Sequence, residues 1–267
     1  MQNTIFITGA SSGLGKAAAK HFHDQGWTVI ATMRRPEEEK DLVQLSNVKL
    51  YALDVTDEQQ INACISEILR MYDVDVVLNN AGYGLIGPLE AFSTEQIQQQ
   101  IQTNLLGVIH ISRAFTPYFR ERNFGTFINV TSTFGLLGYP LCTLYNATKF
   151  AVDGFSESLA YELAQFNIKV KVVAPGGMKT DFAGRSLQGV VHNSYDRLAA
   201  IVSEGYSEEQ IVNYTPAEEV AAIIFGAATD GSGRLRYVAG KDANTLYNER
   251  LELSPEGQFG KMRPLFM

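Results

Sequence analysis

The sequence predicts an α/β protein: a single domain with a doubly wound parallel sheet in three layers (α/β/α). Two observations lead to this fold class. Short apolar runs alternate with longer segments of helical period from residue 5 to residue 239, and a glycine-rich turn directly follows the first run. Regular alternation of strand and helix is typical of right-handed βαβ units, whose parallel strands are covered by helices on both faces.

Each element follows from its local pattern. Apolar and β-branched runs predict strands at residues 5–7, 28–33, 48–53, 75–78, 125–131, 168–173 and 235–239. Helical spacing predicts helices at residues 14–25, 36–45, 57–71, 94–122, 143–166 and 217–228. From residue 177 to about 214 the periodicity fades, and a loop of this length in a compact domain is usually functional, so we predict a substrate-binding lid there. The residues predicted to close over a substrate are Phe182, Leu187, Val190, Tyr195 and Tyr206.

The composition argues against several classes of protein. The 267 residues are 45% hydrophobic and 19% charged, as in an ordinary globular chain. With 22 basic and 29 acidic residues the net charge is −7, which argues against a nucleic-acid partner. Cys64 and Cys142 suggest neither a disulfide framework nor a metal site, and we expect no metal. No basic leader precedes the first apolar run and no stretch reaches the ~20 apolar residues of a membrane span, so we expect a cytoplasmic protein with no membrane partner.

The glycine-rich turn is the candidate cofactor site. Residues 8–15 read TGASSGLG and lie between the first predicted strand and the first predicted helix. In such a turn backbone amides can approach a pyrophosphate, and the helix N-terminus adds its positive dipole end. A glycine-rich turn can also be a purely structural break between two elements, but its position between a strand and a helix favours a dinucleotide site. The candidate contacts are Gly9, Ser11, Ser12, Gly13, Leu14 and Gly15.

Selectivity for a cofactor phosphate is expected at the end of the second strand. Sites for NAD place Asp or Glu there, whereas sites for NADP place an arginine nearby. Here Arg34 and Arg35 follow the strand, and the first carboxylate is that of Glu37. Arginine can pair with a phosphate and stack on adenine, so we expect NADP(H) to be preferred over NAD(H), with Arg34 the stronger candidate. The alternative is that both arginines are solvated surface charges.

Two further strand ends carry polar residues that face the same crevice. Asp54 follows the third strand and can accept a hydrogen bond from an adenine amino group; a helix N-cap is the alternative, but Thr56 or Asp57 fits that role better. Residues 79–82, NNAG, close the fourth strand, where they can line the adenosine ribose or form a simple turn.

Tyr145 and Lys149 are the candidate centre of the chemistry. They are four residues apart in a predicted helix, so they lie on one face. A free tyrosine has a pKa near ~10 and is a poor base at neutral pH, but a neighbouring ammonium favours the phenolate. Such pairs also arise by chance. Ser132, just after the fifth strand, can hold a substrate oxygen beside Tyr145. Asn104 lies inside a predicted helix, where asparagine is unfavourable, so its presence there calls for an explanation.

Together these residues resemble the short-chain dehydrogenases/reductases in their single-domain, Rossmann-like form. The resemblance extends from residue 3 to about residue 240. The residues that carry it, in the family's order and roughly its spacing, are those of segments 8–15 and 79–82 with Asn104, Ser132, Tyr145, Lys149, Pro175, Gly176 and Thr180.

The resemblance implies an enzyme that moves a hydride between NADP(H) and a carbonyl or alcohol. It implies that Tyr145 exchanges the proton, that Lys149 lowers the pKa of Tyr145 and binds the nicotinamide ribose, that Ser132 orients the substrate, and that Asn104 holds a water. It implies homodimers or homotetramers formed through residues 94–122 and 143–166. It also implies cofactor contacts from Arg34, Arg35, Asp54, Val55, Asn80, Ala81, Gly82, Tyr145, Lys149, Pro175, Gly176, Met178 and Thr180.

The residues expected at the mouth of the site are mostly apolar. Ser132, Phe134, Tyr139 and Tyr145 are the predicted substrate contacts. Because no Lys or Arg stands among the mouth residues to pair with a substrate anion, we expect a small, neutral, mostly apolar ketone, aldehyde or secondary alcohol. The equal alternative is that some of them pack in the core or a subunit interface. The other mouth candidates are Tyr83, Leu85, Ile86, Leu136, Leu137 and Leu141.

Two other functions use the same fold. A non-catalytic dinucleotide-binding regulator is one, since fold does not determine function. A lyase or epimerase is the other. A regulator does not need Asn104, Ser132, Tyr145 and Lys149 together, and a complete set beside an intact pyrophosphate turn favours net hydride transfer.

Overall fold

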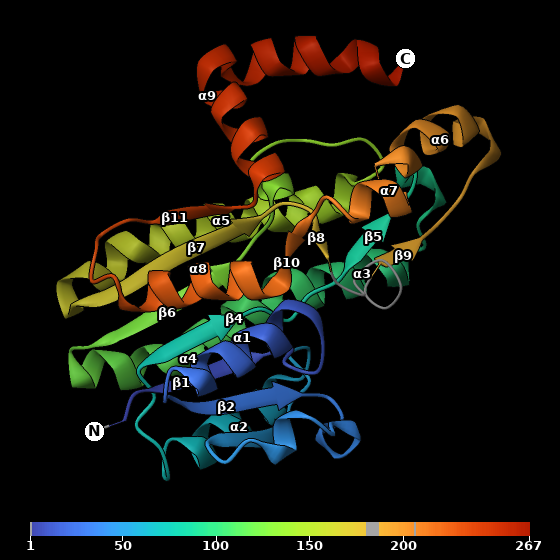
Figure 1. Cartoon of the computed structure of the whole chain (residues 1–267). Helices are drawn as coiled ribbons and strands as arrows, with labels where there is room; N and C mark the ends of the chain where they lie inside the picture. The colour runs from blue at the N-terminus through green and yellow to red at the C-terminus, as the bar shows by residue number, and fades with distance from the viewer. Residues whose placement is uncertain (1, 180–186, 206) are drawn as a thin grey trace.

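The computed structural model describes residues 2–179, 187–205 and 207–267 (Figure 1). The described residues form a parallel sheet of seven strands in the order β11-β7-β6-β4-β1-β2-β3, as the alternating pattern predicts. The strands are β1 (Thr4–Thr8), β2 (Thr28–Met33), β3 (Val48–Ala52), β4 (Val76–Asn79), β6 (Gly125–Val130), β7 (Ile168–Pro175) and β11 (Arg236–Ala239).

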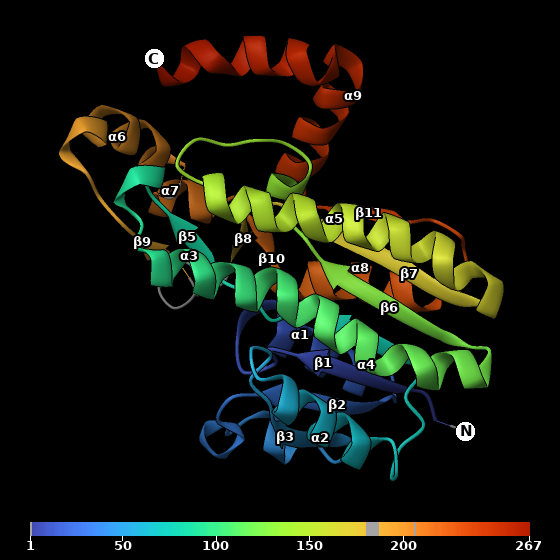
Figure 2. The ribbon, with the colours of Figure 1, turned by 180° about the vertical axis from the view of Figure 1, so that it is seen from behind.

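Helices cover both faces of the sheet, which confirms the predicted three-layer, doubly wound, Rossmann-like architecture of a single domain. On one face lie α1 (Gly13–Asp24) and α8 (Ala217–Thr229), which pack side by side (Figure 1). On the other lie α2 (Glu58–Ile68), α4 (Gly107–Arg122) and α5 (Thr143–Leu163) (Figure 2). Because both faces are covered, every residue of β1 and β6 is buried.

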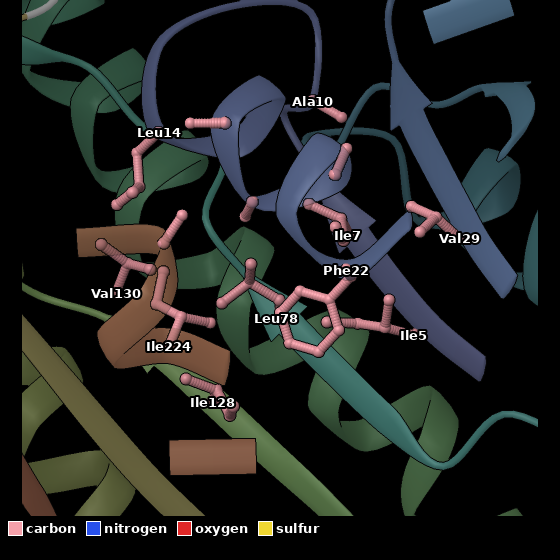
Figure 3. Close-up of a cluster of buried hydrophobic side chains, with 14 of the residues drawn as sticks. Ile5, Ile7, Ala10, Leu14, Phe22, Val29, Leu78, Ile128, Val130 and Ile224 are labelled. Carbon is pink, nitrogen blue, oxygen red and sulfur yellow. The ribbon is translucent and has the colours of Figure 1, made fainter. Parts of the chain in front are cut away.

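The core under α1 and α8 joins these helices to the sheet. Figure 3 shows Leu14 and Phe22 of α1 and Ile224 of α8 packed over the side chains of β1, β4 and β6. Phe22 is completely buried and meets the ring of Trp27 edge-on, with 5.1 Å between the ring centroids. This packing holds the first turn of α1 against the end of β1, where the glycine-rich turn lies.

The strand order reverses at β1. This strand pairs with β2 on one side, where Thr8 lies opposite Thr32, and with β4 on the other, where Ile7 lies opposite Leu78. The chains that leave the carboxyl ends of β1 and β4 therefore diverge, and in doubly wound sheets ligands bind in the crevice formed there. The predicted cofactor segments 8–15 and 79–82 both lie at this point.

The predicted helix over residues 36–45 is wrong. Two 3-10 helices, Pro36–Glu38 and Leu42–Gln44, replace it. The side chain of Glu39 turns inward and accepts hydrogen bonds from the backbone amides of Asp41 and Leu42, at 2.8 Å and 3.0 Å. Glu39 therefore bonds the amides that a continuous helix would use, and its side chain is buried.

The long helix predicted over residues 94–122 has a break in its regular winding. It consists of α3 (Thr94–Ile101), a π-helical turn over Gln102–Leu106, and α4. The start of α3 carries a capping box between Ser93 and Gln96. A π-helical turn shifts the direction of the side chains that follow, and such turns are frequent at functional sites; this one contains Asn104.

The segment predicted as a substrate lid contains regular elements in its described part. It includes β8 (Met178–Lys179), β9 (Leu187–Gly189), α6 (Asp196–Glu204) and α7 (Glu208–Ile211). β9 pairs with β5 (Gly84–Ile86), and β8 pairs with β10 (Thr215–Pro216). These two ladders attach the segment to the main body. Phe182 and Tyr206 lie outside the described residues.

The chain ends in a helix that the sequence pattern does not predict. α9 (Lys241–Met262) and a 3-10 helix, Arg263–Phe266, follow β11. Within α9 only Ala243 and Gln258 are buried, so it lacks the apolar stripe by which helices are recognised in a sequence. Ser254, at φ +66°, precedes Pro255 and bends α9, so that its second part runs back towards α6 (Figures 1 and 2). Across the described ranges, no helix combines the length and the apolar character needed to span a bilayer.

Candidate active site

The turn between β1 and α1 is shaped by its glycines. Gly9 and Gly13 have φ values of +68° and +51°, which favour glycine. A Cβ at Gly9 would lie 2.8 Å from Cα of Ala81, and a Cβ at Gly15 would overlap the carbonyl oxygen of Gly9. Ser12 is the N-cap residue of α1 but its side chain makes no capping hydrogen bond. The first-turn amides of α1 therefore keep their donors for an anionic ligand.

The end of β4 is tied to this turn by Asn80 and Thr8. The Asn80 amide nitrogen Nδ2 donates to the carbonyl oxygens of Thr8 and Gly9, at 3.0 Å and 3.1 Å. The Thr8 hydroxyl Oγ1 accepts from the backbone amides of Asn80 and Ala81, both at 3.0 Å. This segment is predicted either to line the adenosine ribose or to form a turn. The Asn80 side chain has a structural role, because it holds the glycine turn in place.

The structure distinguishes the two arginines after β2. Arg35 forms an exposed ion pair with Glu38 at 2.7 Å. Arg34 is exposed and makes no ion pair or hydrogen bond with any residue that the structure describes. Lys16, at the start of α1, is paired with Glu39 at 2.9 Å and with Asp41 at 2.7 Å. The guanidinium of Arg34 is therefore left to pair with a ligand, unlike the side chains of Arg35 and Lys16.

Asp54 makes a local turn at the end of β3. Its Oδ1 accepts from the backbone amide and the hydroxyl of Thr56, at 2.9 Å and 2.7 Å, while Asp57 caps α2 as expected. The carboxylate is partly exposed, so its other oxygen Oδ2 is left for a ligand. Val55 is buried against Gly107 of α4, where an added Cβ would lie 3.0 Å from the valine methyl.

Tyr145, Lys149 and Ser132 converge at the carboxyl end of the sheet. The helical spacing in α5 places Nζ of Lys149 5.7 Å from the ring centroid of Tyr145. Lys149 is 5% exposed, and its ammonium donates to the carbonyl oxygen of Val130 at 2.9 Å. Ser132 follows β6 and shares a side-chain hydrogen bond with Tyr145. The structure thus brings together three of the four predicted catalytic residues.

Burial dominates the proton equilibria of this pair. It raises the pKa of Tyr145 to about 12, although the hydrogen bond with Ser132 acts to lower it. It also lowers the pKa of Lys149 to about 8, because the buried ammonium has lost its hydration. In the protein alone, loss of hydration therefore sets the pKa of Tyr145, whereas the resemblance implies a lowering of that pKa by Lys149.

Asn104 reaches the site from the π-helical turn. Its Oδ1 accepts from the backbone amide of Tyr83 at 3.0 Å, and its Nδ2 donates to the carbonyl oxygen of Tyr83 at 2.8 Å. Nδ2 also lies 3.5 Å from the hydroxyl of Thr148, the neighbour of Lys149 in α5. A Cβ at Gly82 would lie 3.2 Å from Oδ1 of Asn104 and 3.7 Å from Nζ of Lys149. Asn104 therefore holds the 82–83 backbone beside Lys149, a role that its side chain type allows but its position in the sequence does not reveal.

The loop after β7 is fastened by a residue that the sequence analysis missed. The carboxylate of Asp242, at the start of α9, accepts a hydrogen bond from the backbone amide of Gly177 at 2.7 Å. A Cβ at Gly176 would overlap the same carboxylate. Pro175 ends β7 and Met178 begins β8, so both border this loop, while Thr180 lies outside the described residues. Asp242 is 65 residues from Gly177, and no local pattern connects them.

Two aromatic rings lie on the side of Tyr145 that is predicted to face the substrate. Phe134 meets the ring of Tyr145 edge-on at 6.5 Å, and Tyr139 stacks on Phe134 at 4.7 Å. Both are partly exposed. Some of the other residues predicted at the mouth pack in the core, which is the alternative interpretation. These buried residues are Leu85, Leu136, Leu137 and Leu141. In the part of the chain that is described, no three His, Cys, Asp or Glu side chains gather as metal ligands would.

Comparison with known proteins identifies the family. The model of the short chain dehydrogenase family matches residues 3–190. The chain belongs to the short-chain dehydrogenase/reductase family, and it is an oxidoreductase of that family.

Several relatives and solved structures are similar to it. The chain is 35% identical to Oxidoreductase BOA17 of Botryotinia fuckeliana, over 91% of this chain and 90% of that protein. It is 37% identical to Retinol dehydrogenase 8 of Bos taurus, over 70% of this chain and 62% of that protein. A short-chain dehydrogenase from Streptomyces avermitilis superposes with a TM-score of 0.87 at 30% identity, over 99% and 98% of the two chains. ElxO with NADP bound superposes with a TM-score of 0.75 at 30% identity, over 89% and 98%.

Proposed function

We propose that this oxidoreductase reduces a carbonyl group, a ketone or an aldehyde, to an alcohol with NADPH, and catalyses the reverse reaction with NADP⁺. The observation that carries the proposal is the phenol of Tyr145, hydrogen-bonded to Ser132 and next to the buried ammonium of Lys149. A non-catalytic regulator would gain nothing from burying an ammonium beside a phenol, since burial of a charge is unfavourable.

The residues at the crevice fit NADP. The glycine-rich turn, which we call the cradle, leaves no room for side chains at Gly9 and Gly15 and so suits a pyrophosphate. The first-turn amides of α1 would bind this pyrophosphate. Arg34 would pair with the 2′-phosphate, because Arg35 and Lys16 are already paired. Asp54 and the backbone at residues 81–82 would hold the adenosine. Lys149 and the loop at Gly176 would contact the nicotinamide side of the cofactor. The solved structure of ElxO holds NADP on a similar chain, which supports this assignment.

The protonation states support the reductive direction. NADPH, when bound, supplies the hydride to the carbonyl carbon. With a pKa of about 12, Tyr145 is protonated at neutral pH and can donate its phenolic proton to the carbonyl oxygen. Ser132 would hold that oxygen in line with Tyr145. Lys149, mostly protonated below its pKa of about 8, would stabilise the phenolate left behind.

The substrate is a neutral molecule with a mostly apolar body. Phe134 and Tyr139 are uncharged rings beside the reacting hydroxyl. Among the relatives, Retinol dehydrogenase 8 is named for an alcohol and 3-ketodihydrosphingosine reductase of Bacteroides thetaiotaomicron, 40% identical over 67% of this chain, for a ketone. Both names are consistent with carbonyl and alcohol chemistry at this site.

The first test is cofactor binding. NADPH and NADH are titrated into the wild type, Arg34→Ala and the matched control Arg35→Ala. We expect the wild type to prefer NADPH, Arg34→Ala to lose that preference, and Arg35→Ala to keep it. Reduction of apolar ketones is then assayed with Tyr145→Phe, which should bind NADPH normally but be inactive. Ketone reduction that survives in Tyr145→Phe would contradict the proposed chemistry, and binding of neither cofactor would contradict the enzyme assignment.

We also propose a homodimer or homotetramer formed through α4 and α5. Phe150 and Tyr161 on α5 are 40% and 77% exposed, so this helix presents aromatic surface of the kind that is enriched at protein interfaces. Sedimentation equilibrium tests this: a wild-type monomer would contradict it, and Tyr161→Glu should shift an oligomer towards smaller species.

A further inference from the structure

The aromatic contacts of Tyr145 continue away from the reacting hydroxyl. Phe134 meets Tyr145 edge-on, Tyr139 stacks on Phe134 with an interplanar angle of 14°, and Phe266 meets Tyr139 edge-on at 5.4 Å and 80°. We call these four rings the aromatic row. Three of its members lie within residues 134–145, whereas Phe266 comes from the 3-10 helix at the end of the chain.

The path of α9 explains how Phe266 reaches the row. The helix starts beside the Gly177 loop, where Asp242 fastens it. The bend at Ser254 and Pro255 then sends its second part back across the same end of the molecule, and in both views the chain end lies near α6 (Figures 1 and 2). Arg197 of α6 donates from Nη2 to the carbonyl oxygen of Met267 at 2.5 Å. The last turn is thus tied to α6 at the residue after Phe266.

The last turn presents one side chain to the row and leaves its neighbours in solvent. Leu265 and Met267 are 64% and 65% exposed, whereas Phe266 is partly buried against Tyr139. The orientation is therefore specific to Phe266. Leu265, which is apolar and adjacent but points away, provides a matched control.

We propose that Phe266 forms the outer wall of the substrate site and favours substrates whose apolar body extends well beyond the carbonyl group. This inference rests on the proposed carbonyl reduction. A carbonyl oxygen held by Tyr145 and Ser132 places the nearest part of the substrate beside Phe134, so a short ketone reaches no further than that ring. A longer apolar body continues along Tyr139 to Phe266, where its contact removes further apolar surface from water.

The test compares two ketones and two variants. Reduction of butanone and of 2-nonanone with NADPH is measured for the wild type, Phe266→Ala and Leu265→Ala. In Phe266→Ala we expect kcat/KM for 2-nonanone to fall about tenfold, mainly through KM, because loss of one aromatic contact corresponds to about 1.4 kcal/mol. Values for butanone should not change, and Leu265→Ala should match the wild type with both ketones. Equal behaviour of Phe266→Ala and Leu265→Ala with 2-nonanone would overturn the inference.

A binding measurement separates this inference from the proposed function. Calorimetric titration of 2-nonanone into NADPH-loaded protein should show about tenfold weaker binding to Phe266→Ala than to Leu265→Ala. If the wild type binds 2-nonanone more tightly than Phe266→Ala does but does not reduce it, the proposed function fails, while the contact of Phe266 with the bound apolar chain stands. If the wild type binds no 2-nonanone, or both variants bind it equally, the inference fails.

Discussion

The carboxylate of Asp242 and the backbone amide of Gly177 form a 2.7 Å hydrogen bond that joins the start of α9 to the loop after β7. The same carboxylate leaves no room for a side chain at Gly176. This carboxylate therefore fixes the path of the loop that borders the proposed nicotinamide side, together with backbone hydrogen bonds from Gly176 to Ala239 at 2.9 Å and from Thr215 to Gly177 at 3.1 Å.

Removing this acceptor should loosen the loop. In Asp242→Ala we expect the free energy of unfolding to fall by about 1–3 kcal/mol, because the Gly177 amide loses its partner. Affinity for NADPH should fall as well, since the loop loses one of the contacts that hold it in position. Asp242→Asn, which keeps an acceptor oxygen, should lose much less in both measurements. Denaturant unfolding and NADPH titration check this, and equal losses in the two variants would show that charge, not the hydrogen bond, is what matters.

Gly15→Ala should abolish cofactor binding. The added Cβ overlaps the Gly9 carbonyl oxygen, so the turn must move away from the position in which it can hold a pyrophosphate. The control is Gly226→Ala in α8, where a Cβ meets nothing within 4 Å. That substitution should leave NADPH binding unchanged and stabilise the protein by about 0.5–1 kcal/mol, the helix preference of Ala over Gly. NADPH titration and thermal unfolding of both variants are the measurements; normal binding by Gly15→Ala would contradict the assignment of the cradle.

Glu39 should contribute stability that depends on pH. Burial acts to raise the pKa of its carboxyl, but hydrogen bonds from the Leu42 amide and from Lys16 outweigh it, so the pKa lies below 4.5. A carboxyl with a depressed pKa stabilises the fold above its unfolded pKa, and that contribution is lost as pH falls through the folded value. Glu39→Ala should cost about 1–3 kcal/mol at pH 7.

Urea denaturation at pH 7 and at pH 3 checks this expectation. The difference between wild type and Glu39→Ala should be smaller at pH 3, where the carboxyl of the unfolded chain is protonated. Glu38→Ala is the control, because that carboxyl is exposed and its ion pair with Arg35 is on the surface. A penalty for Glu39→Ala that is the same at both pH values would show that its charge contributes nothing.

Lys149→Met should stabilise the protein while removing activity. Burial lowers the pKa of Lys149 from 10.5 to about 8, so protonating it at pH 7 costs the folded state about 3 kcal/mol, of which Met restores a part. The unfolded chain binds this proton more tightly than the folded one between pH 8 and 10.5, so wild-type stability rises relative to the variant across that range. Urea denaturation at pH 7 and pH 10 measures it: the advantage of Lys149→Met should shrink at pH 10, and a variant less stable than wild type at pH 7 would contradict the expectation.

The sequence by itself determined the seven strands of the sheet. The five inner strands are buried and leave apolar runs, while the edge strands β3 and β11 are partly exposed and still rich in strand-forming residues. The sequence also determined that Tyr145 and Lys149 share a face of α5, since helical spacing is a local property. The glycine turn at residues 8–15 could be placed for the same reason. Where local patterns were weak or misleading, prediction failed: α9 has no apolar stripe, and the predicted helix over residues 36–45 is interrupted where the Glu39 side chain turns inward.

Only the tertiary structure decided which of these residues are already engaged. Arg34 and Arg35 are adjacent in the sequence, but Glu38 pairs with Arg35. Asn80 holds the glycine turn because β4 happens to lie beside β1. Asp242 and Phe266 reach the site from more than 60 residues away, and burial, not spacing, sets the pKa values of Tyr145 and Lys149. Contacts between distant segments and the loss of hydration on burial both depend on how the layers pack. Neither can be predicted from local patterns along the chain.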